Sequence, residues 1–214
     1  MEISWYGHTC FQLSQRGLAT IVTDPYDPAV VGYPPLNLKA DVVTVSRAHP
    51  AHNTLTSVQG APYVIQGPGE YEIGGVFITG VATNGHTKSH PEEPRNTLYV
   101  FSYEGVNVVH LGLINRVPSQ SEVEALGPVH VALAPVGGGD GLNAARAAEV
   151  ISLLDARIVI PMYFATPNTM LQLDPLSKFL KEMGLVEVEN LTSLKVTPNS
   201  LSEQTRVIVL EHPL

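Results

Sequence analysis

The stretch from residue 42 to residue 53 reads VVTVSRAHPAHN, and the interpretation of the whole chain depends on it. Val42–Val45 is a short run of mostly β-branched residues and predicts a buried strand. The residues after it, Ser46–Asn53, include His49 and His52 and have the layout of a metal-binding loop. Zinc takes about three or four imidazole, thiolate or carboxylate ligands, so two histidines are only part of a ligand set. The loop therefore predicts a metal site only if further ligands lie elsewhere in the chain.

Length and charge limit the kinds of protein that this chain can be. Its 214 residues suit one layered α/β or β-rich domain, so we expect residues 1–214 to form a single domain. Twelve Lys and Arg face twenty Asp and Glu, a net charge of −8, and no basic run could follow a phosphate backbone. Nucleic acids and anionic membranes are therefore not expected partners.

The cysteine content and the hydropathy pattern indicate the cellular compartment that we expect for the protein. Cys10 is the only cysteine, which excludes an internal disulfide and removes thiolates as a major source of ligands. The first residues lack the basic and apolar regions of a signal peptide, and no apolar run approaches eighteen residues. We expect a soluble cytoplasmic protein.

Short apolar runs rich in β-branched and aromatic residues dominate the sequence and predict strands. They are Ile3–Tyr6, Phe11–Leu13, Ala19–Thr23, Val42–Val45, Tyr63–Ile65, Val76–Val81, Thr97–Ser102, Val106–Leu111, Val129–Ala134, Ile158–Ile160 and Arg206–Leu210. Glycine-containing turns separate many of them at hairpin spacing, with Glu104-Gly105 as a tight turn. The pattern predicts a first half with largely antiparallel strands.

Helices are predicted mainly in the second half. Asn143 is placed to cap a helix that runs to about Leu154, and Asp174-Pro175 is placed as N-cap and first residue of a helix ending at Gly184. A third helix is expected over Ser119–Leu126. Many strands with a few helices predict a mixed α/β (α+β) fold in which two sheets face each other and helices lie outside.

Several short motifs together resemble one family. They are Trp5-Tyr6-Gly7-His8-Thr9-Cys10-Phe11, Thr23-Asp24-Pro25, Gly67-Pro68-Gly69-Glu70-Tyr71-Glu72-Ile73, His110-Leu111-Gly112, Pro135-Val136-Gly137-Gly138 and Ile160-Pro161-Met162. In this order they resemble the metallo-β-lactamase superfamily, in its branch of small Zn-dependent-hydrolase-like proteins similar to ascorbate-6-phosphate lactonase. The resemblance implies a four-layer αββα sandwich of two βα halves that divide near residue 105. It places an active site at one edge, between the sheets.

The metal loop of that family has the pattern His-x-His-x-Asp-His, and this chain matches it only in part. The four positions fall on Arg47, His49, Ala51 and His52, so the first histidine and the aspartate are replaced. The next family histidine falls on His86, or on His90 in an alternative alignment.

Two further ligand positions of the family have also changed. The bridging aspartate falls on Leu113, and the histidine of Pro-Met-His-Tyr falls on Tyr163. The resemblance assigns Arg47, His49 and His86 to one metal, and Ala51, His52 and Tyr163 to the other. Four of the seven ligand positions are thus replaced, and His49, His52 and His86 are the residual candidate ligands.

The four replacements agree with one another in physical terms. Carboxylates are tolerated in a partly buried metal site because the cations compensate their charge. Ala51 and Leu113 remove both acidic ligands, while Arg47 places a permanent cation where a ligand stood. We therefore expect no dinuclear metal and ordinary hydrogen-bonded histidines, with one Zn or Mn ion as the alternative.

Two other residues are expected to line the former site. Asp24 matches the family aspartate that braces the metal loop, so we expect it to support Arg47 or the loop backbone; the alternative is a turn carboxylate before Pro25. His8 matches a position facing the cleft, where an imidazole is either a base or substrate contact or simply a hydrogen-bonded loop residue.

The remaining motifs do not supply another catalytic apparatus. The glycine-rich segment from residue 135 to residue 141 lacks the Lys-Ser/Thr of a P-loop, so we expect a strand-to-helix connection rather than an anion cradle. The sequence has no Gly-x-Ser-x-Gly elbow, and Cys10 has only His8 beside it.

Three hypotheses about function remain. The first is a metal-free relative, a pseudoenzyme, that binds a small molecule or a protein in the old cleft. The second is a hydrolase of lactones, esters or phosphoesters with a single metal held by His49, His86 and a third group, His52 or His8. The third is a structural subunit of a larger assembly, which includes a homo-oligomer.

Overall fold

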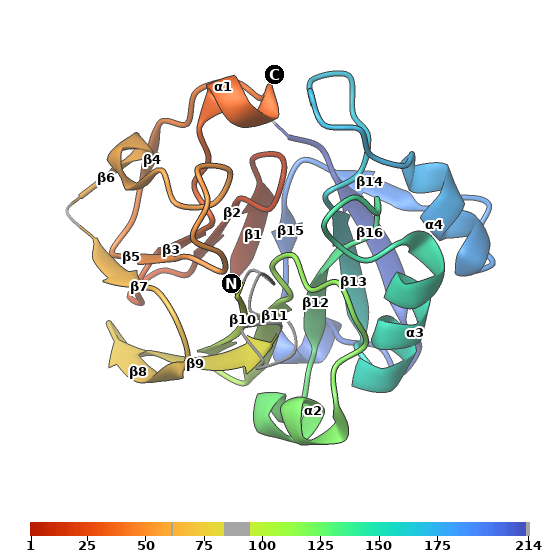
Figure 1. The fold of residues 1–214 in the computed structure, drawn as a ribbon. Helices are drawn as coiled ribbons and strands as arrows, with labels where there is room; N and C mark the ends of the chain where they lie inside the picture. Colours follow the sequence, from red (N-terminus) through yellow and green to blue (C-terminus); the bar gives the residue numbers. More distant parts are fainter. Residues whose placement is uncertain (61, 84–94, 213–214) are drawn as a thin grey trace, which may run out of the picture.

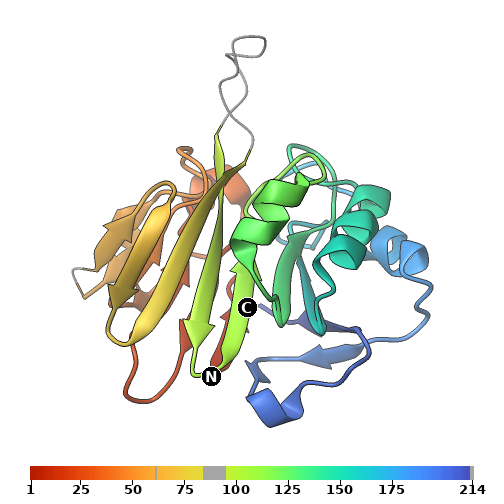
Figure 2. The ribbon, with the colours of Figure 1, turned by 90° about the horizontal axis from the view of Figure 1, so that it is seen from below.

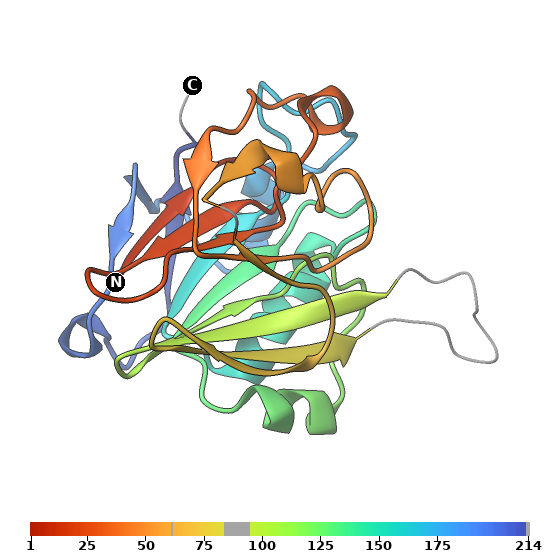
Figure 3. The same ribbon diagram turned by 90° about the vertical axis from the view of Figure 1, so that its left-hand side faces the viewer.

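The computed structural model describes residues 1–60, 62–83 and 95–212, whose strands form two large sheets and one small sheet. The first large sheet has six strands in the order β15-β1-β2-β3-β5-β7, and the second has eight in the order β14-β16-β13-β12-β11-β10-β9-β8. The two sheets face each other, as Figures 1 and 3 show. The chain passes from the first sheet to the second between β7 and β8.

The elements up to β7 belong to the first sheet and its outer cover. The sheet strands among them are β1 (Glu2–Trp5), β2 (Phe11–Ser14), β3 (Ile21–Thr23), β5 (Val42–Thr44) and β7 (Tyr63–Ile65). The outer elements are α1 (Pro28–Val31), the short 3₁₀ turn η1 (Leu55–Ser57) and the paired strands β4 (Leu38–Lys39) and β6 (Val58–Gln59).

The second sheet and its helices come from the rest of the chain. Its strands are β8 (Gly69–Ile73), β9 (Val76–Thr83), β10 (Asn96–Tyr103), β11 (Val106–His110), β12 (Val131–Pro135), β13 (Ile158–Met162), β14 (Glu189–Leu191) and β16 (Arg206–Leu210). The helices are α2 (Gln120–Leu126), α3 (Ala144–Leu154) and α4 (Leu176–Glu182). β15 (Leu194–Lys195) returns to the first sheet, and the 3₁₀ turn η2 (Pro198–Ser200) precedes β16.

All eleven apolar runs that predict strands coincide with strands of the structure. The Glu104-Gly105 turn joins β10 to β11 with positive φ at both residues, as a tight hairpin requires. The sequence pattern misses five strands: β4, β6, β8, β14 and β15. Four of these have two or three residues, which is too short for a periodic signal.

The expectation of a largely antiparallel first half is wrong for one part of the first sheet. β3 pairs with β5, and β5 with β7, in parallel. The segments between these strands are long crossovers that carry α1, β4, η1 and β6, rather than hairpin turns. A crossover of this length returns the chain to the end at which the previous strand began, and the next strand then runs parallel to it.

Two of the three predicted helices begin where the sequence places them. Ser119 and Glu122 form a capping box at α2, and the Asn143 side chain accepts the N–H of Arg146 at α3. The N-cap assignment of Asp174 is wrong, because Pro175 has the extended conformation of the N-cap and α4 begins at Leu176. The Asp174 carboxylate instead accepts a hydrogen bond from Lys178 Nζ at 2.6 Å.

The outer faces of the two sheets are covered differently. Helices α2, α3 and α4 lie on the side of the eight-stranded sheet that faces away from the six-stranded sheet (Figures 1 and 2). The six-stranded sheet is covered by α1, the β4–β6 pair and loops, which enclose a separate apolar cluster containing Tyr26, Val31 and Val43. No helix within the described ranges is long and apolar enough to cross a membrane.

Two tyrosines of β10 fix the main core between the sheets. Tyr99 and Tyr103 are buried on the second sheet, and their hydroxyls donate to backbone oxygens of the first sheet, Val45 at 3.0 Å and Ala19 at 2.7 Å. Each bond satisfies a buried carbonyl group and fixes the distance between the two layers.

Candidate functional site

The candidate site is built from loops that follow the carboxyl ends of strands in both sheets. Asp24 follows β3, the segment 46–53 follows β5, and residues 111–113, 136–141 and 163 follow β11, β12 and β13. The β1–β2 turn adds residues 7–10. Ligand sites in α/β sheets lie at the carboxyl ends of strands, so the chain topology alone brings these loops together.

Asp24 anchors the loop after β5. Its side chain is fully buried; Oδ1 accepts the Ser46 N–H at 2.7 Å and Oδ2 accepts the Ser46 hydroxyl at 2.6 Å. The support of the loop backbone that the sequence predicts for Asp24 is therefore present. The alternative partner, Arg47, pairs with Asp140.

A chain of hydrogen bonds continues from Asp24 through two histidines. His52 Nδ1 lies 3.0 Å from Asp24 Oδ2 and 3.0 Å from Thr9 Oγ1, and His8 Nδ1 lies 3.0 Å from the same hydroxyl. An ionised carboxylate only accepts, so the proton between Asp24 and His52 resides on Nδ1. The Thr9 hydroxyl then accepts from His52 and donates to His8.

His110 joins this group from the second sheet. It is fully buried, and its Nε2 donates to the Thr9 carbonyl oxygen at 2.9 Å and lies 4.0 Å from Asp24 Oδ2. Its Nδ1 has no hydrogen-bond partner in the described part of the chain. We call His8, Thr9, Asp24, Ser46, His52 and His110 the Asp24 network.

The pKa values of three groups in this network, Asp24, His8 and His110, are all lowered. Burial alone would raise the pKa of Asp24, but His52, His110 and Ser46 outweigh it and lower that pKa to about 2. Burial lowers the pKa of His8 well below its usual value, with a smaller contribution from His52, and burial also lowers the pKa of His110. The network therefore combines an ionised carboxylate with neutral imidazoles at His8 and His110.

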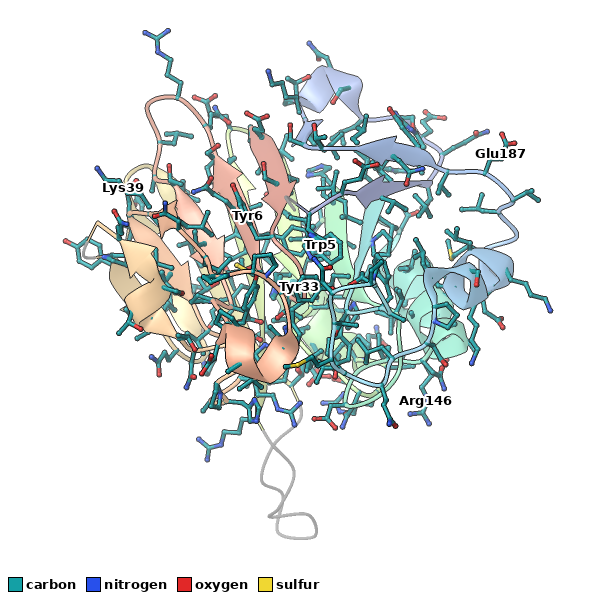
Figure 4. All side chains as sticks on the ribbon, turned by 90° about the horizontal axis from the view of Figure 1, so that it is seen from above. Trp5, Tyr6, Tyr33, Lys39, Arg146 and Glu187 are labelled. Carbon is teal, nitrogen blue, oxygen red and sulfur yellow. The ribbon has the colours of Figure 1, made fainter. Side chains whose placement is uncertain are left out.

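The β1–β2 turn that carries His8 and Thr9 is held by two aromatic side chains. Trp5 Nε1 donates to the His8 carbonyl at 3.1 Å, and the Tyr33 ring packs directly against Gly7. Figure 4 labels Trp5 and Tyr33, whose ring centroids lie 6.3 Å apart. Gly7 is required in this turn because it has φ 95° and any Cβ would overlap the Tyr33 ring.

Arg47 occupies a different part of the site. Its Nη1 lies 3.4 Å from Asp140 Oδ2, in the loop between β12 and α3. The Tyr163 hydroxyl lies against the same loop, since a Cβ at Gly139 would be 3.2 Å from it, and burial together with the Asp140 charge raises the pKa of that hydroxyl. Three segments far apart in the sequence thus meet at Tyr163.

The two positions that the family resemblance matches to acidic ligands are apolar and buried. Ala51 is 5 % exposed and Leu113 is 3 % exposed, so no carboxylate remains at either position. A Cβ at Gly141 would lie 3.4 Å from Leu113 Cδ2 and 3.4 Å from Tyr163 Cδ1, so the glycine-rich loop lies directly against both side chains. We call Arg47, Ala51, Leu113, Asp140 and Tyr163 the Arg47 patch.

His8 and Tyr163 connect the Asp24 network to the Arg47 patch. Their rings meet edge to face with centroids 5.1 Å apart, and the His8 and His52 centroids are 4.8 Å apart. His8, Asp24 and Tyr163 all have positive φ, at 51°, 43° and 54°. Non-glycine residues with positive φ are strained and tend to gather at functional sites, which supports the location of this one.

His49 does not join either group. It is exposed, its Nδ1 accepts the N–H of Ala51 at 3.2 Å, and its ring centroid is 6.5 Å from that of His52. His86 and His90, the alternative matches to the third family histidine, lie outside the described residues. The structure therefore brings together Arg47, Leu113, Tyr163, His8, His52 and Asp24, and Ala51 is buried in the loop that carries Arg47 and His52, in the outer apolar cluster.

The described residues do not fit a dinuclear metal. Within the three described ranges, no group of three or more His, Cys, Asp or Glu side chains is arranged to hold a metal ion. Arg47 carries a permanent positive charge that opposes a cation nearby. Cys10 is buried with a raised thiol pKa, caused by burial and by Asp24, so it offers no thiolate.

Comparison with known proteins assigns the family. The family described as the β-lactamase superfamily domain matches residues 2–163. The chain belongs to the β-lactamase superfamily. A solved structure from Thermotoga maritima, described as a candidate Zn-dependent hydrolase of the metallo-β-lactamase superfamily, is 37 % identical with a TM-score of 0.81 and covers 99 % of both chains. The fold expected from the sequence motifs is thus confirmed.

Two relatives in archaea extend the similarity at lower identity. A UPF0173 protein of Pyrococcus furiosus is 28 % identical over 86 % of this chain and 90 % of its own length. A UPF0173 metal-dependent hydrolase of Methanoculleus marisnigri is 26 % identical over 95 % of this chain and 100 % of its own length. The β-lactamase superfamily member described here is therefore similar over most of its length to proteins named as metal-dependent hydrolases.

The sequence interpretation missed several residues of the site. Thr9, Ser46 and His110 hold the Asp24 network together, and Asp140 is the partner of Arg47. All four residues lie in motifs that the sequence singles out, but the sequence does not predict their contacts. Asp140 gave a signal, since it is the only charged residue in the glycine-rich loop.

Proposed function

We propose that this β-lactamase superfamily protein has lost its dinuclear metal site and its hydrolytic activity, and that it binds a small molecule or a protein at the old ligand positions. The observation that carries the proposal is the composition of the Arg47 patch. A guanidinium, an alanine, a leucine and a tyrosine stand at positions where the family has metal ligands, and two of them are buried apolar side chains. Such a patch supports contact with an uncharged or anionic group rather than with metal ions.

The Asp24 network supports the proposal in a second way. In the family this aspartate braces the metal loop, and here it still does so, through Ser46 and His52. The loop therefore has a support that does not need a metal. A binding role requires a rigid loop, and the network supplies it.

The alternative function is a metal-dependent hydrolase with one Zn or Mn ion and a lactone, ester or phosphoester substrate. The names of the archaeal relatives favour it, and His49 and His52 are its candidate ligands within the described residues. The ion would be held by His49 and His86, with His52 or His8 as the third ligand. Such a site would activate a bound water as the nucleophile.

Elemental analysis of protein purified without chelator, repeated after incubation with zinc and manganese, separates the two functions. We expect far less than one metal ion per chain and no turnover of lactone, ester or phosphoester substrates. A variant with Arg47→His, Ala51→Asp, Leu113→Asp and Tyr163→His serves as the positive control, because it restores the family's ligand types and should retain zinc.

The outcomes are distinct. Two metal ions per wild-type chain would contradict the proposal. One ion per chain, lost together with activity in His49→Ala, would establish the alternative. A metal-free wild-type chain beside a zinc-containing restored variant would support the proposal, because the four replacements would then be sufficient to explain the loss.

A further inference from the structure

The guanidinium of Arg47 is poorly satisfied for a charge that is mostly buried. Its side chain is 14 % exposed, and its partner among the described residues is Asp140 at 3.4 Å. That separation is longer than the ~2.7–3.2 Å of a normal N–H···O bond. By contrast, the far more exposed Arg206 makes a hydrogen bond to Glu189 at 2.8 Å. Arg47 therefore has donors that its present partner does not use.

The loop around Asp140 is held by backbone hydrogen bonds rather than by the Asp140 carboxylate. The carboxylate side chain is 70 % exposed, whereas the Gly138 N–H donates to the Leu142 carbonyl at 2.9 Å and the Gly141 N–H donates to the Gly138 carbonyl at 3.0 Å. Gly138 and Gly139 precede it with φ 71° and 60°, and Gly141 follows against Leu113. The carboxylate can turn into solvent without moving the loop, because the loop's own contacts are made by the backbone.

The surroundings of Arg47 favour an oxyanion over other groups. Ala51 and Leu113 leave no carboxylate at the two former acidic positions, and Asp140 is the one acidic side chain paired with Arg47 in the described part of the chain. Burial raises the pKa of the Tyr163 hydroxyl, which therefore keeps its O–H proton as a donor. A planar guanidinium with a nearby phenol donor matches the two-oxygen geometry of a carboxylate or a phosphate.

We propose that the Arg47 patch binds the oxyanion group of a small ligand, a carboxylate or a phosphate, which replaces the Asp140 carboxylate on the Arg47 guanidinium. The inference rests on the proposed binding function and names its ligand class. Asp140 acts as the internal competitor: it neutralises Arg47 in the free protein and swings into solvent when the ligand binds.

The test is a titration of the wild-type protein with inorganic phosphate and, separately, with acetate, at constant ionic strength set with sodium chloride. Binding is followed by isothermal calorimetry and by the shift of the thermal unfolding midpoint. Saturable binding at one site per chain is expected for at least one of the two anions. The anion that binds more tightly identifies whether the ligand group is a phosphate or a carboxylate.

Two variants give opposite expected results. Arg47→Gln removes the charged donor, so the affinity should fall at least about ten-fold. Asp140→Asn removes the internal competitor, so the affinity should rise about two- to five-fold, the range expected for a partly exposed ion pair. Asp140 is exposed, so this variant should fold even if Arg47→Gln does not. Arg47→Lys keeps the charge without the planar fork and should lie between the wild type and Arg47→Gln.

The exposed pair Arg206–Glu189 provides matched controls. Arg206→Gln and Glu189→Gln make the same changes of charge far from the Arg47 patch, so they should leave anion affinity unchanged. Unchanged binding in Arg47→Gln, or no gain in Asp140→Asn, would overturn the inference. Absence of saturable binding by either anion would do the same.

Measuring metal content on the same protein separates this inference from the proposed function. Two metal ions per chain would contradict the proposed function whatever the anions do. A metal-free protein without Arg47-dependent anion binding would leave the proposed function standing and contradict only the ligand class.

Discussion

The Asp24 network and the Arg47 patch lie side by side in one site, yet they differ in almost every physical respect. The network is buried, is connected by hydrogen bonds and includes the family's bracing aspartate. The patch contains the replaced ligand positions, two apolar side chains and one long ion pair that is open to solvent at Asp140. The difference teaches that support of a loop and recognition by that loop are separable. If the proposed function is correct, the framework that supports the loop has stayed in place although the ligand residues have changed.

The largest loss of stability is expected when the negative charge of the Asp24 network is removed. Asp24→Asn keeps the shape of the side chain but leaves Ser46 and His52 facing an amide, so the free energy of unfolding should fall by about 3–5 kcal/mol. Chemical denaturation measures it. Asp174→Asn, which breaks the exposed pair with Lys178, is the control and should cost less than about 1 kcal/mol. Equal effects in the two variants would show that the network does not stabilise the fold.

A carboxylate returned to the patch should also be harmful, for a different reason. Leu113→Asp buries a charge without a cation, so the free energy of unfolding should fall by roughly 3 kcal/mol. Zinc should restore stability only in the variant that carries all four restored ligand types. If zinc stabilises Leu113→Asp alone, the wild-type histidines hold a metal more readily than proposed.

Acid should weaken the network through its buried histidines. Because the pKa values of His8 and His110 are lowered by burial, the unfolded chain binds protons below about pH 6.5 that the folded chain does not. The free energy of unfolding should therefore fall on acidification below that pH, by up to about 1.4 kcal/mol per pH unit for each histidine. Asp24 acts in a lower window: its contribution is present above about pH 4 and is lost as the pH falls towards 2.

His110→Gln tests whether the buried histidines cause this pH dependence of the free energy of unfolding. It removes one of the two histidines of the Asp24 network whose pKa is lowered, while keeping a donor for the Thr9 carbonyl, so the slope between about pH 7 and pH 5 should decrease by up to about one proton. The measurement is chemical denaturation of both proteins across this range. An unchanged slope would place the titration elsewhere in the molecule.

The smallest change in the free energy of unfolding is expected for a substitution in the Arg47 patch. Asp140→Asn breaks only a long, solvent-exposed ion pair, so the free energy of unfolding should change by less than about 1 kcal/mol. The same denaturation measurement checks it, with Glu189→Gln as the matched control. A large loss of stability would show that the ion pair supports the loop, and the contrast with the Asp24 network would then disappear.

The sequence predicted the fold further than it predicted the site. Each strand run left a signal because burial of one or both faces selects β-branched residues locally, and Asn143 and Ser119 mark their helix starts by local chemistry. The parallel pairing of β3, β5 and β7 left no such signal, because it depends on where a long crossover returns.

The site is assembled from segments that are more than ninety residues apart in the sequence, which explains what was missed. The pair formed by Arg47 and Asp140, and the bond from His110 to Thr9, exist only after both sheets have formed. The replaced ligand positions were visible because a family pattern gave their spacing. Their new partners had no pattern, and only the three-dimensional structure reveals them.

The return of β15 to the first sheet has a consequence for how the protein is made. β15 pairs with β1, so this edge of β1 stays uncovered until residues 194–195 have been synthesised. The six-stranded sheet cannot be completed while residues 1–105 are being translated, and its bare edge is open to pairing with another chain during that time. Truncation before Leu194 should therefore favour aggregation over folding.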